Sequence, residues 1–202
     1  GAGAVYLNVF HSDINEFLDS KKINVDEKIR IKSLSIGVII PDKFMQLAME
    51  DEVCYTFNPH TVFLEYGQYL DEMDMNEMYE KLVDNPNVKK KKINARELLV
   101  KISQTQKESG YPYLFFKDNA NKEHALKEIG SVKFSNLCTE IMQLSEVSDI
   151  NAYYEEDTIR RGISCNLGSL NIATVMENKR IKEATKAAID SLTMVSDLTN
   201  ID

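Results

Sequence analysis

The sequence lacks the features that mark membrane-spanning, secreted and nucleic-acid-binding proteins. No apolar run approaches the roughly 20 residues that a transmembrane helix needs, and no charged-then-apolar signal segment opens the chain. Lys and Arg number 24 against 32 Asp and Glu, and the net charge of -8 argues against a nucleic-acid partner. These absences favour a soluble cytoplasmic protein with no membrane and no nucleic-acid partner.

Cysteine and histidine are also scarce, with three of each. The cysteines are odd in number and far apart, which argues against a secreted disulfide framework, so reduced thiols are expected. They are Cys54, Cys138 and Cys165. The histidines lack the spacing of a metal site, so no metal is expected in this chain. They are His11, His60 and His124.

What is present fits a mixed α/β fold, because helical patterns alternate with short apolar runs of strand length. The expected strands are residues 5–10, 34–40, 53–57 and 113–116. The expected helices are residues 12–18, 94–108, 181–195 and a segment capped by Asp42. No repeat or linker divides the 202 residues, so one domain is expected, and the abrupt ends suggest a piece of a longer protein.

Two segments allow a binding interpretation that the sequence favours less than a structural one. The run from Lys89 to Lys92 could bind phosphate, but a solvated turn before a capped helix is the more common use of such a run. The methionines Met73, Met75 and Met78 form a stripe that is typical of adaptable packing rather than of metal binding.

The segment from Phe134 to Ile141 carries the clearest chemical pattern. If it is extended, Asn136, Cys138 and Glu140 project to one side, because successive side chains alternate. An amide can hold hydroxyls, a carboxylate can move a proton, and a thiol can act as nucleophile or redox centre. A lone cysteine is more often an inert small hydrophobe, so the spacing alone leaves both interpretations open.

A second cysteine-containing segment runs from Ile163 to Asn171. It is compatible with a buried strand and turn, in which Gly168 supplies a tight backbone position. Alternatively, Cys165 is a redox partner of Cys138 or of a thiol elsewhere, which requires Cβ atoms within about 4 Å. Cys54 lies in a predicted strand without an acid-base partner nearby in sequence and is interpreted as core.

These two segments resemble a known family. Residues 135–141 are similar to the active-site segment of the large subunit of class I ribonucleotide reductases, and residues 163–171 to the redox-cysteine segment that follows it. Further resemblance, over residues 1–7, 58–62 and 109–113, extends it along nearly the whole chain. The amino-acid sequence of residues 1–7 and 26–32 looks closest to that of the bacterial and phage subclass Ib enzymes.

The resemblance implies a fold and a set of roles. Residues 1–202 would be the central part of the catalytic barrel domain, an incomplete α/β barrel of parallel half-sheets, with a finger loop around residues 130–141. Cys138 would be the thiyl radical that removes the substrate's 3'-hydrogen, Glu140 would accept the 3'-hydroxyl proton, and Asn136 would hold the ribose hydroxyls. Cys165 would be a redox-active thiol that ends in a disulfide with a cysteine earlier in the longer protein.

The resemblance also implies binding segments and partners. The substrate-binding residues would be Asn136, Leu137, Cys138, Thr139 and Glu140, and the end of an effector loop would be Gly1, Ala2 and Gly3. The substrate would be a ribonucleoside diphosphate and the effector a nucleoside triphosphate. A metal-radical cofactor would sit on a partner small subunit, with none bound in this chain. The remaining segments of the large subunit and a thioredoxin- or glutaredoxin-like reductant would complete the enzyme, and the isolated chain would be inactive.

Two alternatives come from different functional classes. In the first, Cys138 is a nucleophile of another thiol-dependent enzyme, activated by a histidine such as His60 or His124. Such a thiol should alkylate fast, which a thiol titration would detect. In the second, the chain is a non-catalytic acidic assembly module with buried thiols, and it binds no nucleoside diphosphate.

Overall fold

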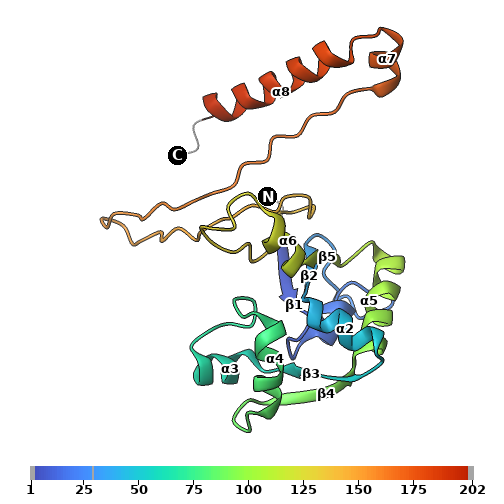
Figure 1. Cartoon of the computed structure of the whole chain (residues 1–202), viewed down its shortest axis with the longest axis vertical. Coiled ribbons are helices and arrows are strands. Elements are labelled where there is room, and N and C mark those ends of the chain that lie inside the picture. The colour runs from blue at the N-terminus through green and yellow to red at the C-terminus, as the bar shows by residue number, and fades with distance from the viewer. Residues whose placement is uncertain (1–2, 29, 200–202) are drawn as a thin grey trace. The chain divides into compact units, whose positions relative to one another are not determined.

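The computed structural model describes residues 3–28 and 30–199 (Figure 1). The chain divides into two compact units, unit 1 from Gly1 to Leu144 and unit 2 from Ser145 to Asp202. Within the described residues, no helix is long and apolar enough to cross a membrane.

Unit 1 is built around a three-stranded parallel sheet in the order β1-β2-β5. Its strands are β1 (Ala4–Asn8), β2 (Ser35–Ile40) and β5 (Tyr113–Phe116). The central strand β2 is buried along its whole length, as is typical of a parallel strand that is covered on both faces. In the register, Gly37 lies between Tyr6 of β1 and Tyr113 of β5.

Helices cover one face of this sheet. They include α1 (Ile14–Asp19), α2 (Asp42–Met49) and α5 (Ala95–Ser109), and Figure 1 shows α2 and α5 beside one another. The main hydrophobic core lies between the helices and the strands. Its fully or nearly fully buried members include Phe10, Ile14, Leu18, Val38, Ile40, Phe44, Leu98 and Ile102.

The opposite face of the sheet is covered by an irregular segment of chain. A second, smaller core consists of Ile39 of β2, Phe115 of β5 and Val132, with Tyr6 and Met142 packed against it. The helix α6 (Lys117–Glu123) leads from β5 to this segment. Residues 130–142 therefore lie across the sheet face opposite α1, α2 and α5.

An antiparallel pair completes unit 1. Strand β3 (Val53–Phe57) pairs with β4 (Lys90–Asn94), and α3 (Pro59–Tyr66) and α4 (Met75–Asp84) lie between them in sequence. The lysine run, predicted to be a turn, instead forms most of β4, because pairing with β3 satisfies its backbone while its side chains stay exposed. The packing prediction is confirmed for Met73 and Met75, which are buried.

Caps explain where several helices begin and end. Asn94 accepts a hydrogen bond from the Glu97 N–H at the start of α5, and Gly110 ends α5 with a left-handed φ of 77°. The predicted cap at Asp42 is wrong by one residue, because Pro41 is the N-cap and Asp42 lies in the first turn. Asn58 caps α3, a helix that the sequence analysis did not predict.

Unit 2 contains α7 (Ile172–Glu177) and α8 (Ile181–Leu198) after a long irregular segment. The predicted helix over residues 181–195 is confirmed, and it extends three residues further. No residue of unit 2 in the described range 145–199 is buried, which contrasts with the dense core of unit 1.

Candidate active site

The loop that carries Cys138 is anchored where it enters the sheet face. Asn121 of α6 brackets the backbone of Val132: its side-chain oxygen accepts from the Val132 N–H at 2.7 Å, and its Nδ2 donates to the Val132 carbonyl at 2.9 Å. Val132 is buried against Ile39 and Phe115. The start of the loop is thereby fixed by both polar and apolar contacts.

The two sides of the loop are joined at Ser135 and Ile141, which lie six residues apart. The Ser135 hydroxyl, in a buried residue, donates to the Ile141 carbonyl at 2.7 Å. Between these residues the Thr139 N–H donates to the Asn136 carbonyl at 3.3 Å, which closes a four-residue turn. Leu137 and Cys138 occupy the centre of this turn, and both side chains are exposed.

The turn corrects the prediction of an extended segment from Phe134 to Ile141. The alternation of side chains does not hold through residues 136–139, because the chain reverses there. The Asn136 side-chain oxygen accepts from the Glu140 N–H at 3.1 Å and the Ile141 N–H at 3.3 Å. Asparagine commonly stabilises turns in this way. Its oxygen thus supports the loop.

Two tyrosines border this loop, on the sheet face that residues 130–142 cover. Tyr6 and Tyr113 lie on either side of Gly37. Burial raises the pKa of Tyr6, and the nearby charges of Glu140 and Cys138 act in the same direction. Desolvation also raises the pKa of Tyr113, with smaller contributions from Tyr111 and Cys138. Both phenols therefore stay protonated at neutral pH beside the Cys138 thiol.

Cys165 lies in unit 2, in a segment that packs along α8. The neighbouring Asn166 donates from Nδ2 to the Leu192 carbonyl at 3.2 Å and to the Ser196 hydroxyl. A Cβ at Gly168 would lie 3.3 Å from a Leu192 methyl group, so glycine permits this close approach. Of the two interpretations of this segment, the buried strand is wrong, because residues 163–171 have no regular structure and Cys165 is exposed.

Cys54 differs from the other two cysteines. It is fully buried in the core of unit 1, and burial raises the pKa of its thiol to about 12. A thiol in this environment is almost entirely protonated at neutral pH and is chemically inert. The interpretation of Cys54 as a core residue is confirmed.

The structure offers no histidine base for Cys138 within the described residues. His124 is buried, and its Nδ1 accepts from the Leu126 N–H at 3.3 Å. Its Nε2 has no hydrogen-bond partner in the part of the chain that the structure describes. His60 lies in the first turn of α3. Neither histidine forms a hydrogen bond with Cys138 there, so the pairing that activates a nucleophilic thiol is not seen.

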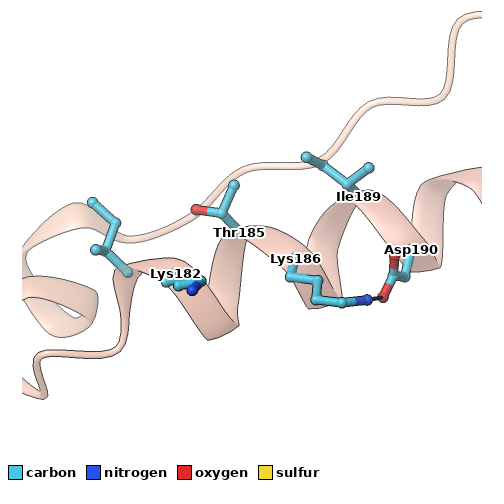
Figure 2. Close-up of a pocket in the computed structure, with 6 residues that line it drawn as sticks. Lys182, Thr185, Lys186, Ile189 and Asp190 are labelled. Carbon is cyan, nitrogen blue, oxygen red and sulfur yellow. Dashed lines mark hydrogen bonds and ion pairs between the residues drawn. The ribbon is translucent and has the colours of Figure 1, made fainter.

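A hollow of about 440 Å³ lies elsewhere, along α8 (Figure 2). Its lining comes from one helix only, and Lys186 and Asp190 form an ion pair of 2.5 Å beside it. It contains none of the predicted site residues. A surface lined by a single helix brings no convergent set of catalytic groups together, so the Cys138 loop remains the candidate active site.

Comparison with known proteins identifies the family of this chain. The family model described as ribonucleotide reductase, barrel domain, matches residues 1–202. The chain belongs to this family. The ribonucleoside-diphosphate reductase subunit alpha of Bacillus subtilis (strain 168) is 62% identical over 201 residues, which cover 100% of this chain and 29% of that relative. The same subunit of Mycoplasma genitalium is 44% identical over 206 residues, covering 100% of this chain and 28% of the relative.

A more distant relative extends the same pattern. The ribonucleoside-diphosphate reductase subunit alpha of Helicobacter pylori (strain J99) is 33% identical over 218 residues, covering 100% of this chain and 27% of the relative. The chain therefore spans less than a third of the length of these relatives. Membership in the reductase family confirms the predicted family and its mixed α/β barrel class, here as an incomplete barrel with a parallel sheet.

The effector loop predicted from the resemblance is only partly within the described structure. Gly1 and Ala2 lie outside the described residues. Gly3 is described, and its carbonyl accepts from the Ser35 N–H at 3.1 Å, which continues the pairing of β1 with β2. Its role in effector binding stays a prediction.

Three residues that shape the reductase-family loop have no clear signal in the sequence. Asn121 anchors its start, Ser135 joins its two sides, and Tyr6 contacts its turn from β1. The only local signal was a tyrosine within an apolar strand, since a buried phenol usually has a hydrogen-bond partner. The partners themselves lie up to 133 residues away in sequence, so no local pattern indicates them.

Proposed function

We propose that this chain supplies the radical-bearing loop of a ribonucleoside-diphosphate reductase. Residues 1–202 would be the central part of its catalytic barrel domain. One observation carries the proposal: Cys138 is exposed at the tip of a turn that Val132 and Ser135 hold against a buried sheet face. A radical thiol needs both features, since it must reach the substrate and must stay in a fixed place.

The first step would be removal of the substrate's 3'-hydrogen by a thiyl radical on Cys138. Glu140, two residues along the loop, would accept the proton of the 3'-hydroxyl as a general base. The Asn136 oxygen is already engaged by the loop backbone, so its Nδ2 would donate to a ribose hydroxyl. Leu137 and Thr139 would complete the contacts with the substrate.

The reduction would consume two thiols. Cys165 and a cysteine elsewhere in the longer protein would provide two electrons and two protons. The 2'-hydroxyl would leave as water, a hydrogen would replace it, and the two sulfurs would end in a disulfide. Cys138 would then return a hydrogen atom to the 3'-carbon, which restores the thiyl radical. A thioredoxin- or glutaredoxin-like protein would restore the thiols by disulfide exchange. The exposure of Cys165 supports this role, because exchange requires direct access to a sulfur atom.

The proposed enzyme needs components beyond this chain. A metal-radical cofactor on a partner small subunit would supply the oxidising equivalent for Cys138. The other segments of the large subunit would complete the barrel, and a nucleoside triphosphate effector would act through residues 1–3. The proposed location is the cytoplasm, where thiols are kept reduced.

The test uses the full-length protein with its small subunit, a reductant and a nucleoside diphosphate that carries a hydrogen isotope on its 3'-carbon. Cys138→Ser should abolish both release of the label and formation of deoxynucleotide. Cys165→Ser should still release label but should form no deoxynucleotide, because only the reduction is blocked. Glu140→Gln should slow turnover by about 10²–10⁴-fold, the usual loss when acid-base assistance is removed.

Cys54→Ala is the matched control, because it removes a thiol from the core and should leave the pattern of label release unchanged. Label release by Cys138→Ser together with none by Cys165→Ser would reverse the two roles. Failure of the full-length protein to bind any nucleoside diphosphate would instead favour the non-catalytic assembly module.

A further inference from the structure

Tyr6 lies on the edge strand β1, and its ring reaches over the central strand β2. Its neighbour across the β1-β2 pair is Gly37, and a Cβ at that position would overlap the Tyr6 ring. The glycine therefore lets the ring lie across β2. The ring packs against Phe134 in a stacked arrangement and against Phe115 edge-on, with centroid separations of 6.3 and 6.4 Å. These contacts direct the phenol oxygen toward the Cys138 turn.

The phenol oxygen contacts both ends of that turn. It lies 2.7 Å from the Asn136 carbonyl oxygen and 2.5 Å from the Thr139 hydroxyl oxygen. A carbonyl can only accept, so Tyr6 donates its single proton to Asn136, and the Thr139 hydroxyl donates to Tyr6. One side chain from β1 thereby links the first and last residues of the turn.

The turn itself is poorly suited to hold its own shape. Thr139 has a φ of 66°, a left-handed conformation that is rare for a β-branched residue and persists only when its surroundings enforce it. The backbone hydrogen bond that closes the turn is long, at 3.3 Å. The two hydrogen bonds to Tyr6 supply the enforcement from outside the loop.

The protonation state of Tyr6 suits this arrangement. Burial raises the pKa of its phenol, so the donor proton is retained throughout the neutral range. The hydrogen bond to the Asn136 carbonyl requires that proton, because an ionised phenol could not donate.

We infer that Tyr6 is a positioning residue whose hydroxyl holds the Asn136–Thr139 turn and so fixes the location of Cys138. The effect on turnover rests on the proposed function, whereas the effect on the loop concerns this chain alone. Loop exchange and turnover measured in the same variant therefore test the positioning role and the proposed function separately.

The test is Tyr6→Phe in the full-length protein, because this change removes the hydroxyl and keeps the ring. Hydrogen exchange should become about tenfold faster at the amides of Thr139, Glu140 and Ile141, as expected when hydrogen bonds that support their acceptors are lost. Tyr66→Phe is the matched control, since that hydroxyl also donates to a backbone carbonyl, at Lys81, away from the loop. It should leave these amides unchanged.

The hydroxyl of Thr139 provides a second variant pair. Thr139→Val should accelerate exchange at Glu140 and Ile141, whereas Thr139→Ser keeps the donor and should restore slow exchange. The double variant Tyr6→Phe with Thr139→Val should exceed Tyr6→Phe alone by little, because Tyr6→Phe already removes the hydrogen bond that Thr139→Val removes. In the reductase assay, Tyr6→Phe should lower kcat about tenfold with little change in KM.

The outcomes separate the two proposals. Faster loop exchange in Tyr6→Phe without any reductase activity in the unmodified protein would support the positioning role and contradict the proposed function. An active enzyme in which Tyr6→Phe changes neither loop exchange nor kcat would overturn the positioning role and leave the function standing.

Discussion

The helices α5 and α8 have similar amphipathic patterns but very different environments. In α5, the residues Ala95, Leu98, Ile102 and Thr105 are buried against the core of unit 1. In α8, no residue is buried, and Ile189 and Val195 are 59% and 52% exposed. The comparison shows that periodicity specifies which face of a helix is apolar. Burial of that face depends on which elements the fold brings to it.

The largest expected difference between buried and exposed regions concerns the thiols. At pH 8, Cys54 should react with iodoacetamide at least about a thousandfold more slowly than a free cysteine, because its pKa of about 12 leaves almost no thiolate. Cys138 and Cys165 are exposed and should be labelled first. Mass spectrometry of timed digests would measure this order. Early labelling of Cys54 would show that the core of unit 1 is more open than described.

Truncation of a core side chain in unit 1 should lower the free energy of unfolding far more than truncation of an exposed side chain in unit 2. Phe10 is fully buried against Phe44, Phe57 and Tyr79, and Phe10→Ala should lower the free energy of unfolding by about 3–5 kcal/mol. Ile189→Ala in α8 is the control and should change it by less than about 0.5 kcal/mol. Urea denaturation followed by circular dichroism would measure both, since the chain lacks tryptophan. Equal losses of stability in the two variants would contradict the difference in burial between α8 and the core of unit 1.

A smaller effect should appear at alkaline pH. Burial raises the pKa of Cys54 from 9.0 to about 12, so above pH 9 the unfolded chain ionises while the folded chain does not. The contribution of the neutral Cys54 thiol to the free energy of unfolding should be present below pH 9. Above that pH the free energy of unfolding should fall, approaching a slope of about 1.4 kcal/mol for each pH unit. Denaturation at pH 8 to 10 would measure this slope. Cys54→Ala should flatten it between pH 9 and 10, before Tyr79, whose pKa burial also raises, contributes.

Several elements could be predicted because their signals are local. The strands β3 and β5 have the predicted bounds, since short apolar runs end at Asn58 and Lys117. Helix α5 begins after Asn94 and ends at Gly110, as its caps indicate. Caps and periodicity act over a few residues, so the sequence carries them directly. The two cysteine segments were identified for a different reason, through their resemblance to a family.

The structure of the site could not be predicted in the same way. The reversal at residues 136–139 replaces the extended conformation that alternation suggested, and Tyr6, 130 residues before Asn136, supports it. The lysine run became a strand because β3 was available to pair with it. The sequence alone determined the apolar faces, the caps and the reactive residue types, because these depend on near neighbours. Only the tertiary structure decided which faces are buried and where Cys138 is held, because those depend on contacts between distant segments.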